Sequence, residues 1–341
     1  MHSFGSVRFA FASLIALAAC SCGAATTRVA PVGVSLSEEP SGTLVAKSAP
    51  PSPAVPDDVV RRAAQAFHAR RNADGHELDQ RQLFDELSHY DVLCLGEEHD
   101  APRDHFAELA VVEALARRAR VSGRALGVGF EMFQEPYGDA LRSYARGRLS
   151  EAALRKRTHY DERWGFPYAY YRPVLAYGRA LGLSLRALNA SRELTHAVAV
   201  NGLSGLTPRL RRQLPDLDLD NSAHRAQFDR LMANHPAQAG MDPEKFYAAQ
   251  VVWDETMAEN AAGWVAARAP QRQLVVLAGS AHCRREAIPA RVERRVTTRV
   301  VSVKLSPQSP EESDGFSYTL IFDPGAPAAP VPTNDESGDD G

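Results

Sequence analysis

Two segments of the sequence place carboxylates and histidines directly after an apolar run. Val92–Asp100 reads VLCLGEEHD and Val275–His282 reads VVLAGSAH, so both contain the pattern Gly-x-x-His after the apolar run. Carboxylate and imidazole side chains can transfer protons near neutral pH, and together they can bind a divalent cation. Because the pattern follows two separate apolar runs, we expect either an internal duplication of strand–Gly-x-x-His units or at least two histidines that face one crevice.

Other polar residues follow apolar runs of the same kind. In open parallel sheets, ligands bind beyond the carboxyl ends of the strands, so residues at these ends share one region. A carboxylate that ends a buried strand must be solvated, paired with a cation or bound to a metal. The candidates at or near the predicted strand ends are Glu97, Glu98, His99, His105, Glu131, Asn189 and His282.

Three interpretations of this polar cluster are open. In a hydrolase, Glu97 or Glu131 would be the general base for water, and His99 and His282 would bind a divalent metal or the substrate. In a binding protein, the cluster would lie beneath a ligand that is not turned over. In a structural domain tethered to a surface, the cluster would be inherited and inactive.

The stretch Phe246–Trp264 predicts a helix whose apolar face also carries polar groups. Gln250 and Trp253 share this face at helical spacing, and Asp254 lies beside them. The preferred interpretation is a core helix in which Asp254 tethers a loop. The alternative is one wall of a binding site.

The stretch Arg163–Gly178 concentrates aromatic residues in a protein that is only 8% aromatic. Together with Arg163 and Arg172, these residues could line a site for a flat, acidic, aromatic ligand, or they could pack a helical subdomain. The aromatic residues are Trp164, Phe166, Tyr168, Tyr170, Tyr171 and Tyr177.

Apolar periodicity predicts the elements that must position these residues. Strand, helix and strand follow one another from about 90 to 133, which indicates a parallel βαβ unit. The expected fold is α/β, an open and mostly parallel sheet with a large helical insertion, or lid, at about 137–268. Strands are predicted at 90–96, 125–133, 183–189, 273–279 and 297–305, with a last edge strand at 316–322. Helices are predicted from Asp57 to about Arg71, near 81–87, from an N-cap at Asp100 to beyond Leu115, and through most of 137–182 and 191–268.

The two ends of the chain predict export and attachment to a membrane. Residues 1–19 have the pattern of a signal peptide, and Leu17–Cys20 resembles a bacterial lipobox, in which Cys20 would carry the lipid. Ser21 rather than Asp follows Cys20, and the resemblance to bacterial lipoproteins then implies the outer membrane. We expect a flexible tether at 20–57, the folded domain at 58–322 and a disordered acidic tail at 323–341.

Composition narrows the class of protein. Apolar residues make up 44% of the chain, and no run of Lys and Arg is long enough to indicate nucleic acid as a partner. Cys94 and Cys283 lie next to the two Gly-x-x-His segments. Export would permit a disulfide, but the preferred interpretation is that Cys94 is a small buried apolar residue.

Six motifs follow one another between about Tyr90 and Arg291: GEEHDAPRDHF, FEMF, YYRP, LNASR, AQVVWDETMA and VVLAGSAH. In this order, behind a lipobox, they resemble the ChaN-like haem-binding lipoprotein family, within the wider Tiki/TraB and erythromycin-esterase-like group. The resemblance implies an α/β core with a helical lid. It also implies a lipid-anchored protein that handles haem or iron at the cell envelope. Ala287, before Ile288 and Pro289, departs from the glycine that the family often has in the loop framing the ligand.

The resemblance further implies haem as the cofactor and a tyrosine as the iron ligand. A phenolate suits ferric haem, and we choose Tyr171, in the YYRP motif. Two protomers would pair around stacked haems, and an outer-membrane haem receptor would be a partner. The residues expected around the haem are Tyr171, Arg172, Trp164, Tyr168, Gln250, Trp253 and Asp254.

We rank haem binding without turnover first. The alternative is a metal-dependent or Glu/His-dependent esterase or peptidase, as in relatives of the wider group. The sequence leaves the choice between carrier and enzyme open.

Overall fold

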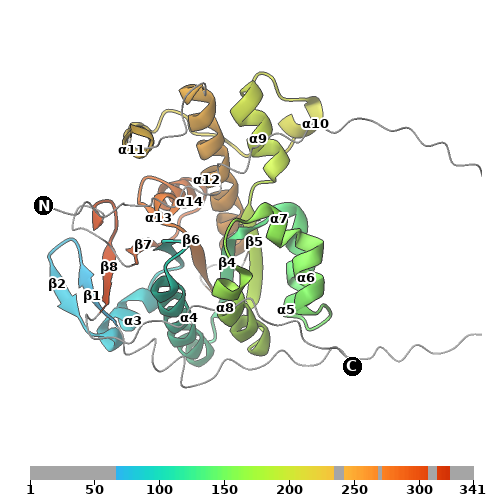
Figure 1. Ribbon diagram of the computed structural model, residues 1–341. Helices are drawn as coiled ribbons and strands as arrows, with labels where there is room; N and C mark the ends of the chain where they lie inside the picture. The colour runs from blue at the N-terminus through green and yellow to red at the C-terminus, as the bar shows by residue number, and fades with distance from the viewer. Residues whose placement is uncertain (1–66, 234–241, 268–270, 306–312, 323–341) are drawn as a thin grey trace, which may run out of the picture.

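The computed structural model describes residues 67–233, 242–267, 271–305 and 313–322 (Figure 1). The predicted signal peptide, Cys20, the tether and the acidic tail lie outside these residues. Within them, the strands form one eight-stranded sheet in the order β2-β1-β8-β7-β3-β6-β4-β5. The strands are β1 (Phe67–Arg71), β2 (His76–Leu78), β3 (Val92–Glu97), β4 (Ala125–Gln134), β5 (Ser184–Asn189), β6 (Arg272–Gly279), β7 (Val300–Lys304) and β8 (Tyr318–Phe322).

The sheet is mostly parallel, which confirms the predicted α/β class. Every neighbouring pair from β8 to β5 runs parallel, whereas β1 pairs antiparallel with β8 and with β2 at one edge. The carboxyl ends of the parallel strands therefore meet at one edge of the sheet. The strands that precede the two Gly-x-x-His segments, β3 and β6, are direct neighbours.

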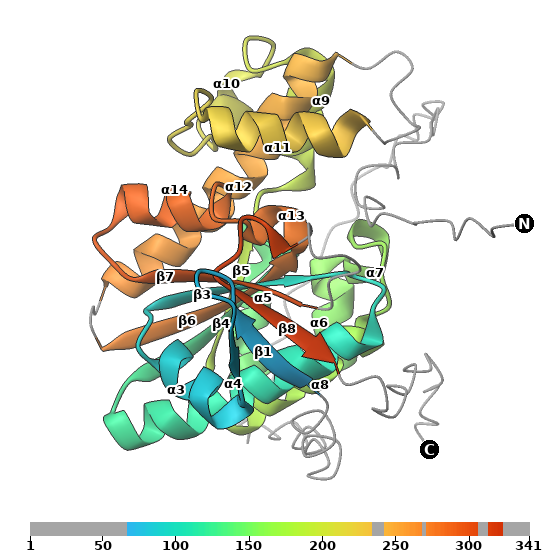
Figure 2. The ribbon, with the colours of Figure 1, turned by 90° about the vertical axis from the view of Figure 1, so that its left-hand side faces the viewer.

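Helices cover both faces of the sheet and give the molecule three layers (Figures 1 and 2). Because successive residues of a strand point to opposite faces, Leu93 and Leu95 pack in the core with α3, α4 and α8, whereas Val92 and Cys94 pack with α12 and α14. In Figure 2, α9, α10 and α11 stand above α12 at the top of the molecule. The helices are α3 (Gln80–Ser88), α4 (Pro102–Ser122), the short 3-10 helix η1 (Glu135–Tyr137), α5 (Gly138–Ala145), α6 (Glu151–Thr158), α7 (Tyr160–Arg163), α8 (Tyr168–Ala180), α9 (Arg192–Asn201), α10 (Pro208–Arg211), α11 (Ser222–Ala233), α12 (Pro243–Ala266), α13 (Ser280–Cys283) and α14 (Ile288–Arg295).

Local sequence explains where the two longest helices begin and end. In α12, the Asp242 side chain accepts a hydrogen bond from the backbone N–H of Glu244, and Pro243 occupies the first turn, where its missing N–H costs nothing. In α4, Pro102 begins the helix, and Gly123 ends it in the left-handed region at a φ of 71°. The predicted N-cap at Asp100 is wrong by one residue, because Ala101 takes that position without a side-chain bond.

Two predicted elements at the ends of the folded body are wrong. Residues 67–71, predicted as the end of a helix, form β1, because they pair with β8 along their whole length. β8 is not an edge strand, since it lies between β7 and β1. Both errors have one cause. The pairing partners are about 250 residues apart in sequence, and local propensity carries no information on such contacts.

The interpretation of Cys94 as an unpaired apolar residue is also wrong. Cys94 and Cys283 form a disulfide, with their Cα atoms 5.2 Å apart. Both residues are completely buried. The bond is possible because α13 follows β6 directly and folds back over β3, which the sequence spacing alone could not show.

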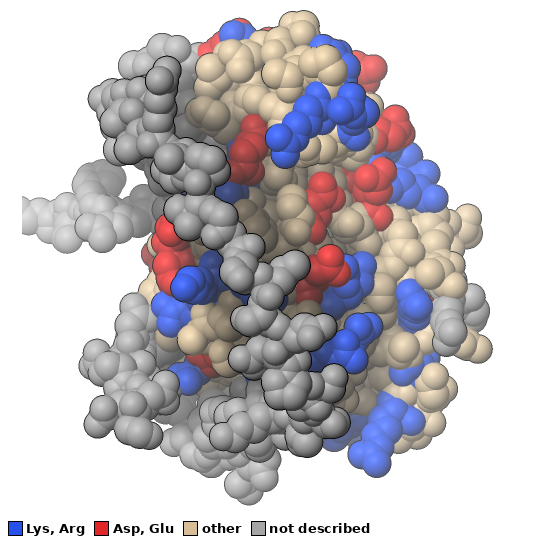
Figure 3. Space-filling view, turned by 90° about the vertical axis from the view of Figure 1, so that its right-hand side faces the viewer, with Lys and Arg blue, Asp and Glu red and all other residues tan. Residues whose placement is uncertain are grey.

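The surface carries both signs of charge. On the face shown in Figure 3, Lys and Arg are interspersed with Asp and Glu. In the described ranges, no helix combines the length and the apolar character that a membrane span requires.

Candidate functional site

The pairing of β3 with β6 brings the two Gly-x-x-His segments side by side. Glu97 lies opposite Gly279 in the register, His99 follows two residues after Glu97, and His282 lies in α13. A Cβ on Gly279 would lie 3.0 Å from His99 Nε2, which is closer than ordinary van der Waals contact. The glycine therefore permits the close approach of β6 to the imidazole. It is not needed for an unusual backbone angle, because its φ is −54°.

Four residues predicted at strand ends form one contiguous cluster. His99 Nδ1 lies 2.5 Å from Glu97 Oε1, and His99 Nε2 faces Glu131 Oε2 at 4.0 Å. His282 Nε2 lies 3.4 Å from Glu131 Oε1, so the Glu131 carboxylate stands between two imidazoles. The backbone N–H of Gly279 donates a hydrogen bond of 2.7 Å to Glu131 Oε2. The structure thus brings together the four residues that a hydrolase would use.

Burial and charge together set the pKa values of these histidines. Burial alone would lower the pKa of His282, but the charges of Glu131 and Asp254 outweigh it and raise the pKa to about 9. Burial also disfavours the charged form of His99, but its hydrogen bond with Glu97 and the charge of Glu131 raise its pKa. Near neutral pH the cluster therefore holds imidazolium–carboxylate pairs, which can deliver or accept a proton.

Asp254 holds His282 from the side opposite Glu131. Asp254 Oδ1 lies 2.5 Å from His282 Nδ1, and Gln250 Nε2 lies 3.2 Å from the same nitrogen. Asp254 Oδ2 lies 2.8 Å from His224 Nε2. Burial opposes ionisation of Asp254, but the two histidines outweigh it and hold the pKa of this carboxyl well below its usual range. Trp253 presents its ring to His282 at 6.4 Å between centroids. Asp254 therefore orients two histidines. The sequence favoured a different role, in which Asp254 tethers a loop.

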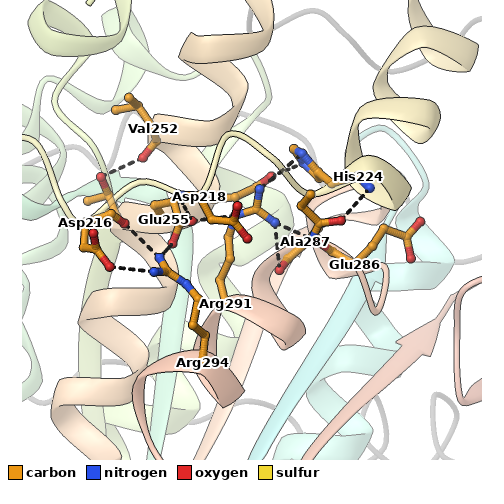
Figure 4. A network of polar contacts seen from close by, with 12 residues as sticks. Asp216, Asp218, His224, Val252, Glu255, Glu286, Ala287, Arg291 and Arg294 are labelled. Carbon is orange, nitrogen blue, oxygen red and sulfur yellow. Dashed lines mark hydrogen bonds and ion pairs between the residues drawn. The ribbon is translucent and has the colours of Figure 1, made fainter.

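The contacts continue from His224 into a network of buried charges (Figure 4). Arg291 Nη2 lies 3.2 Å from His224 Nδ1, and Arg291 Nε lies 3.3 Å from Glu255 Oε1. Arg294 and Arg295 also pair with Glu255, which is completely buried. Three guanidinium groups on one carboxylate hold α14 against α12, and His224 joins α11 to both.

A second set of contacts lies on the other side of Glu97. His105 Nδ1 is 3.3 Å from Glu97 Oε2 and 3.2 Å from Glu108 Oε2, and Tyr171 donates its hydroxyl to Glu97 Oε1 at 2.7 Å. Burial would raise the pKa of Glu97, but His105 and His99 outweigh it and bring the pKa well below its usual range. Burial and the charge of Glu97 raise the pKa of Glu108 well above its usual range.

The placement of Tyr171 argues against its predicted role as iron ligand. Its side chain is completely buried, its hydroxyl is bonded to Glu97, and burial and the charge of Glu97 raise its pKa well above the usual value. Ferric haem would need the phenolate, which this environment disfavours. The preceding residue, Tyr170, is half-buried and stacks on His105 at 4.8 Å between ring centroids. Its hydroxyl makes no hydrogen bond within the described part of the chain.

Part of the aromatic segment borders the cluster, and part packs elsewhere. The rings of Trp164 and Phe166 lie 4.9 and 4.8 Å from that of His99. Tyr168 packs edge-on against the tyrosine that begins α7, and Arg172 pairs with a glutamate of α6 at 3.1 Å. Trp164 and Phe166 therefore lie beside the cluster, whereas Tyr168 and Arg172 pack within the helical insertion.

Two other strand-end candidates have partners outside the histidine cluster. Glu98 Oε1 lies 2.5 Å from Lys304 Nζ and accepts a hydrogen bond of 2.8 Å from Ser280 Oγ. Because Lys304 is only 2% exposed, Glu98 neutralises a buried cation. Asn189 accepts a hydrogen bond from the backbone N–H of Ala190. A position at a strand end therefore does not by itself determine which side chains meet.

The predicted metal ligands, His99 and His282, are each held by carboxylates. Among the residues that the structure describes, a different group has the spacing of metal ligands. The donor atoms of Glu97, His105 and Glu108 all lie within 4.8 Å of one another.

Sequence reasoning missed His224, Lys304 and the pair Glu255–Arg291. His224 comes from a helix of the insertion, 30 residues before Asp254, and follows no strand. Lys304 ends a strand, so its position was an available signal. Glu255 follows Asp254 in a helix whose buried residues are mostly apolar, and this acidic pair was a second available signal.

A family model described as haem-binding uptake, Tiki superfamily, ChaN matches residues 83–292. The chain belongs to this family. The resemblance inferred from the six motifs is thereby confirmed. Among solved structures, this ChaN family member is similar to the ChaN of Campylobacter jejuni, described by its cofacial haem binding, at 18% identity and a TM-score of 0.62. The match covers 76% of this chain and 98% of that one, and at this identity it shows a shared fold.

Two further proteins are similar to this chain, one with a lower structural similarity and one over a smaller share of its own length. An erythromycin esterase in its open conformation matches at 11% identity and a TM-score of 0.41, over 72% of this chain and 79% of that one. The chloroplastic protein RETICULATA-RELATED 5 of Arabidopsis thaliana is 27% identical over 232 residues, which are 64% of this chain and 31% of that protein. This ChaN family member therefore spans about a third of the length of that curated relative.

Proposed function

We propose that this ChaN family member binds ferric haem and takes part in haem or iron uptake at the cell envelope. The family match over residues 83–292 carries the proposal. The fold shared with the ChaN of Campylobacter jejuni, whose structure is described by its haem binding, supports it.

We assign the haem-iron ligand to Tyr170 rather than to Tyr171. Tyr170 offers a half-buried phenol without a hydrogen-bond partner in the described residues, and a phenolate is a good ligand for ferric haem. Phe166, also half-buried, offers an apolar surface nearby. Gln250 and Asp254 are engaged with the histidine on α13, so we assign them to the support of the site.

We also propose attachment through a lipid on Cys20 to the outer membrane. The lipobox-like sequence supports this attachment. Pairing of two protomers around haem and exchange with an outer-membrane haem receptor are part of the same proposal, and the family resemblance supports both.

The test is a titration of the full-length protein with ferric haem, followed at the Soret band. Tyr170→Phe and Tyr171→Phe are a matched pair, because they remove the same hydroxyl from adjacent residues. We expect saturable binding, weakened about tenfold or more by Tyr170→Phe and nearly unchanged in Tyr171→Phe. If only Tyr171→Phe weakened binding, the ligand assignment would be wrong. If wild-type protein showed no saturable binding, the haem proposal itself would fail.

The second candidate function is hydrolysis of an ester or peptide. The contacts around His282 favour it: Asp254 orients the ring through Nδ1, and Nε2 faces Glu131, as required of an acid–base pair. A screen of ester and peptide substrates should then show activity that Glu131→Gln reduces by about 100-fold or more. Equal activity of the two proteins, or none in either, would exclude this function for the cluster.

A further inference from the structure

Glu97, His105 and Glu108 form a compact buried group between β3 and α4. The exposed fractions of these residues are at most 4%. His105 Nδ1 lies 3.3 Å from Glu97 Oε2 and 3.2 Å from Glu108 Oε2. Ligand atoms about 2.0–2.1 Å from a tetrahedral metal ion are themselves about 3.3–3.4 Å apart. The nitrogen–oxygen distances in this group therefore match the edges of a metal coordination shell.

The orientation of His105 is the one that metal-binding histidines adopt. His105 Nε2 lies 3.1 Å from the backbone carbonyl oxygen of His99, and because that oxygen can only accept, Nε2 carries the hydrogen. Nδ1 then points at the two carboxylates and is hydrogen-bonded to Glu108 Oε2 through a proton that a metal ion would replace. Histidine ligands of metals usually donate their other ring N–H to a carbonyl or carboxylate, which fixes the tautomer. The ring is further held by stacking against Tyr170 and by edge contact with Tyr171.

Two carboxylate oxygens of the group are left without hydrogen bonds. Glu97 Oε1 contacts both Tyr171 and His99, but Glu97 Oε2 has no hydrogen-bond partner within the described residues, although it faces His105 Nδ1. Glu108 Oε1 is buried and also lacks such a partner there. A buried acceptor without a hydrogen bond costs about 1–3 kcal/mol, so these two oxygens would be stabilised by a bound cation.

We propose that Glu97, His105 and Glu108 bind one divalent transition-metal ion of the zinc type. One imidazole nitrogen and two carboxylate oxygens are a ligand set that zinc accepts. The site is distinct from the predicted pair His99 and His282, and it uses neither tyrosine as a ligand. It joins the end of β3 to the first turns of α4, and through Glu97 it positions His99. This inference goes beyond haem binding and does not depend on it.

The test measures zinc on the untagged, haem-free, full-length protein in detergent. After treatment with a chelator and its removal, Zn²⁺ is titrated by calorimetry, and the bound metal is counted by elemental analysis. We expect about one zinc per chain, a rise in melting temperature on binding, and an X-ray absorption shell of nitrogen and oxygen at about 2.0–2.1 Å. His105→Gln and Glu108→Gln should weaken binding about 100-fold or more.

His282→Gln distinguishes this site from the neighbouring cluster, because it removes an imidazole that lies outside the proposed ligand set. It should leave the zinc count and affinity unchanged. Circular dichroism of each variant shows whether the chain is folded, so that loss of metal is not confused with loss of structure. The proposal is overturned if folded wild-type protein binds no zinc, or if His105→Gln retains the metal while His282→Gln loses it. Haem titration of the same preparations separates failure here from failure of the haem proposal.

Discussion

Breaking the disulfide Cys94–Cys283 should destabilise the folded domain substantially. The bond joins β3 to α13 across 189 residues and lies one residue after His282. A crosslink that closes so long a loop restricts the unfolded chain, and the chain-entropy relation gives about 5 kcal/mol at this length. Because typical measured contributions are about 2–4 kcal/mol, we expect a loss in that range. For a domain of this size, the melting temperature should fall by about 4–16 °C.

The assay needs a protein in which this pair contains the only cysteines. Cys20→Ser and Cys22→Ser provide that background, since the chain has four cysteines. Thiols are counted in denaturant with and without prior reduction, and unfolding is followed by calorimetry under both conditions. The additional double variant Cys94→Ala, Cys283→Ala is the control, because a reductant should leave its melting temperature unchanged.

Two results would refute the reasoning. Two reactive thiols in the protein before reduction, after purification without a reductant, would show that the bond does not form. A broken bond with a change in melting temperature below about 1 °C would show that loop closure contributes little.

Three further predictions concern the histidine cluster. Asp254→Asn should lower the pKa of His282 from about 9 towards its ordinary range, which NMR titration of the imidazole can measure; no change would contradict the assigned contact. Because the pKa of His282 is raised by folding, its contribution to stability is fully present below about pH 6.5 and is lost as the pH rises through about 9. Denaturant unfolding of wild type should show this loss, and the variant should show a smaller one, because Glu131 still raises the pKa. Gly279→Ala would place a Cβ 3.0 Å from His99 Nε2 and should lower the free energy of unfolding by about 1–3 kcal/mol. Gly263→Ala is the control, because a Cβ there meets nothing within 4 Å, and it should be neutral or stabilising. Equal effects of the two substitutions would contradict the packing argument.

Local sequence was sufficient for the interior elements of the sheet. The apolar runs at 92–97 and 272–279 are strands because they are buried on both faces, and such runs need no partner to be recognised. These two runs and the run at 125–134 lead into the polar residues of the cluster, so Glu97, His99, Glu131 and His282 could be predicted to meet. The ends of parallel strands converge, and that rule holds whatever the order of the strands.

Local sequence did not predict elements whose pairing partner lies far away in the sequence. Residues 67–71 are rich in residues that form helices well, yet pairing with β8 makes them a strand. Pairing of β3 with β6 likewise determined the disulfide, because it brought Cys94 to Cys283. The two cysteines were visible in the sequence, but their distance in space was not.

By itself, the sequence determined the α/β class, the family and the chemical types in the cluster, because periodicity and motif order are local properties of the chain. The tertiary structure alone decided which atoms those side chains face. Tyr170 and Tyr171 are adjacent and identical in type, but successive helical residues point about 100° apart, so one is half-buried and the other is buried against Glu97. His224 reaches Asp254 only because α11 packs beside α12. Such directions depend on how elements dock, and docking is a property of the whole folded chain.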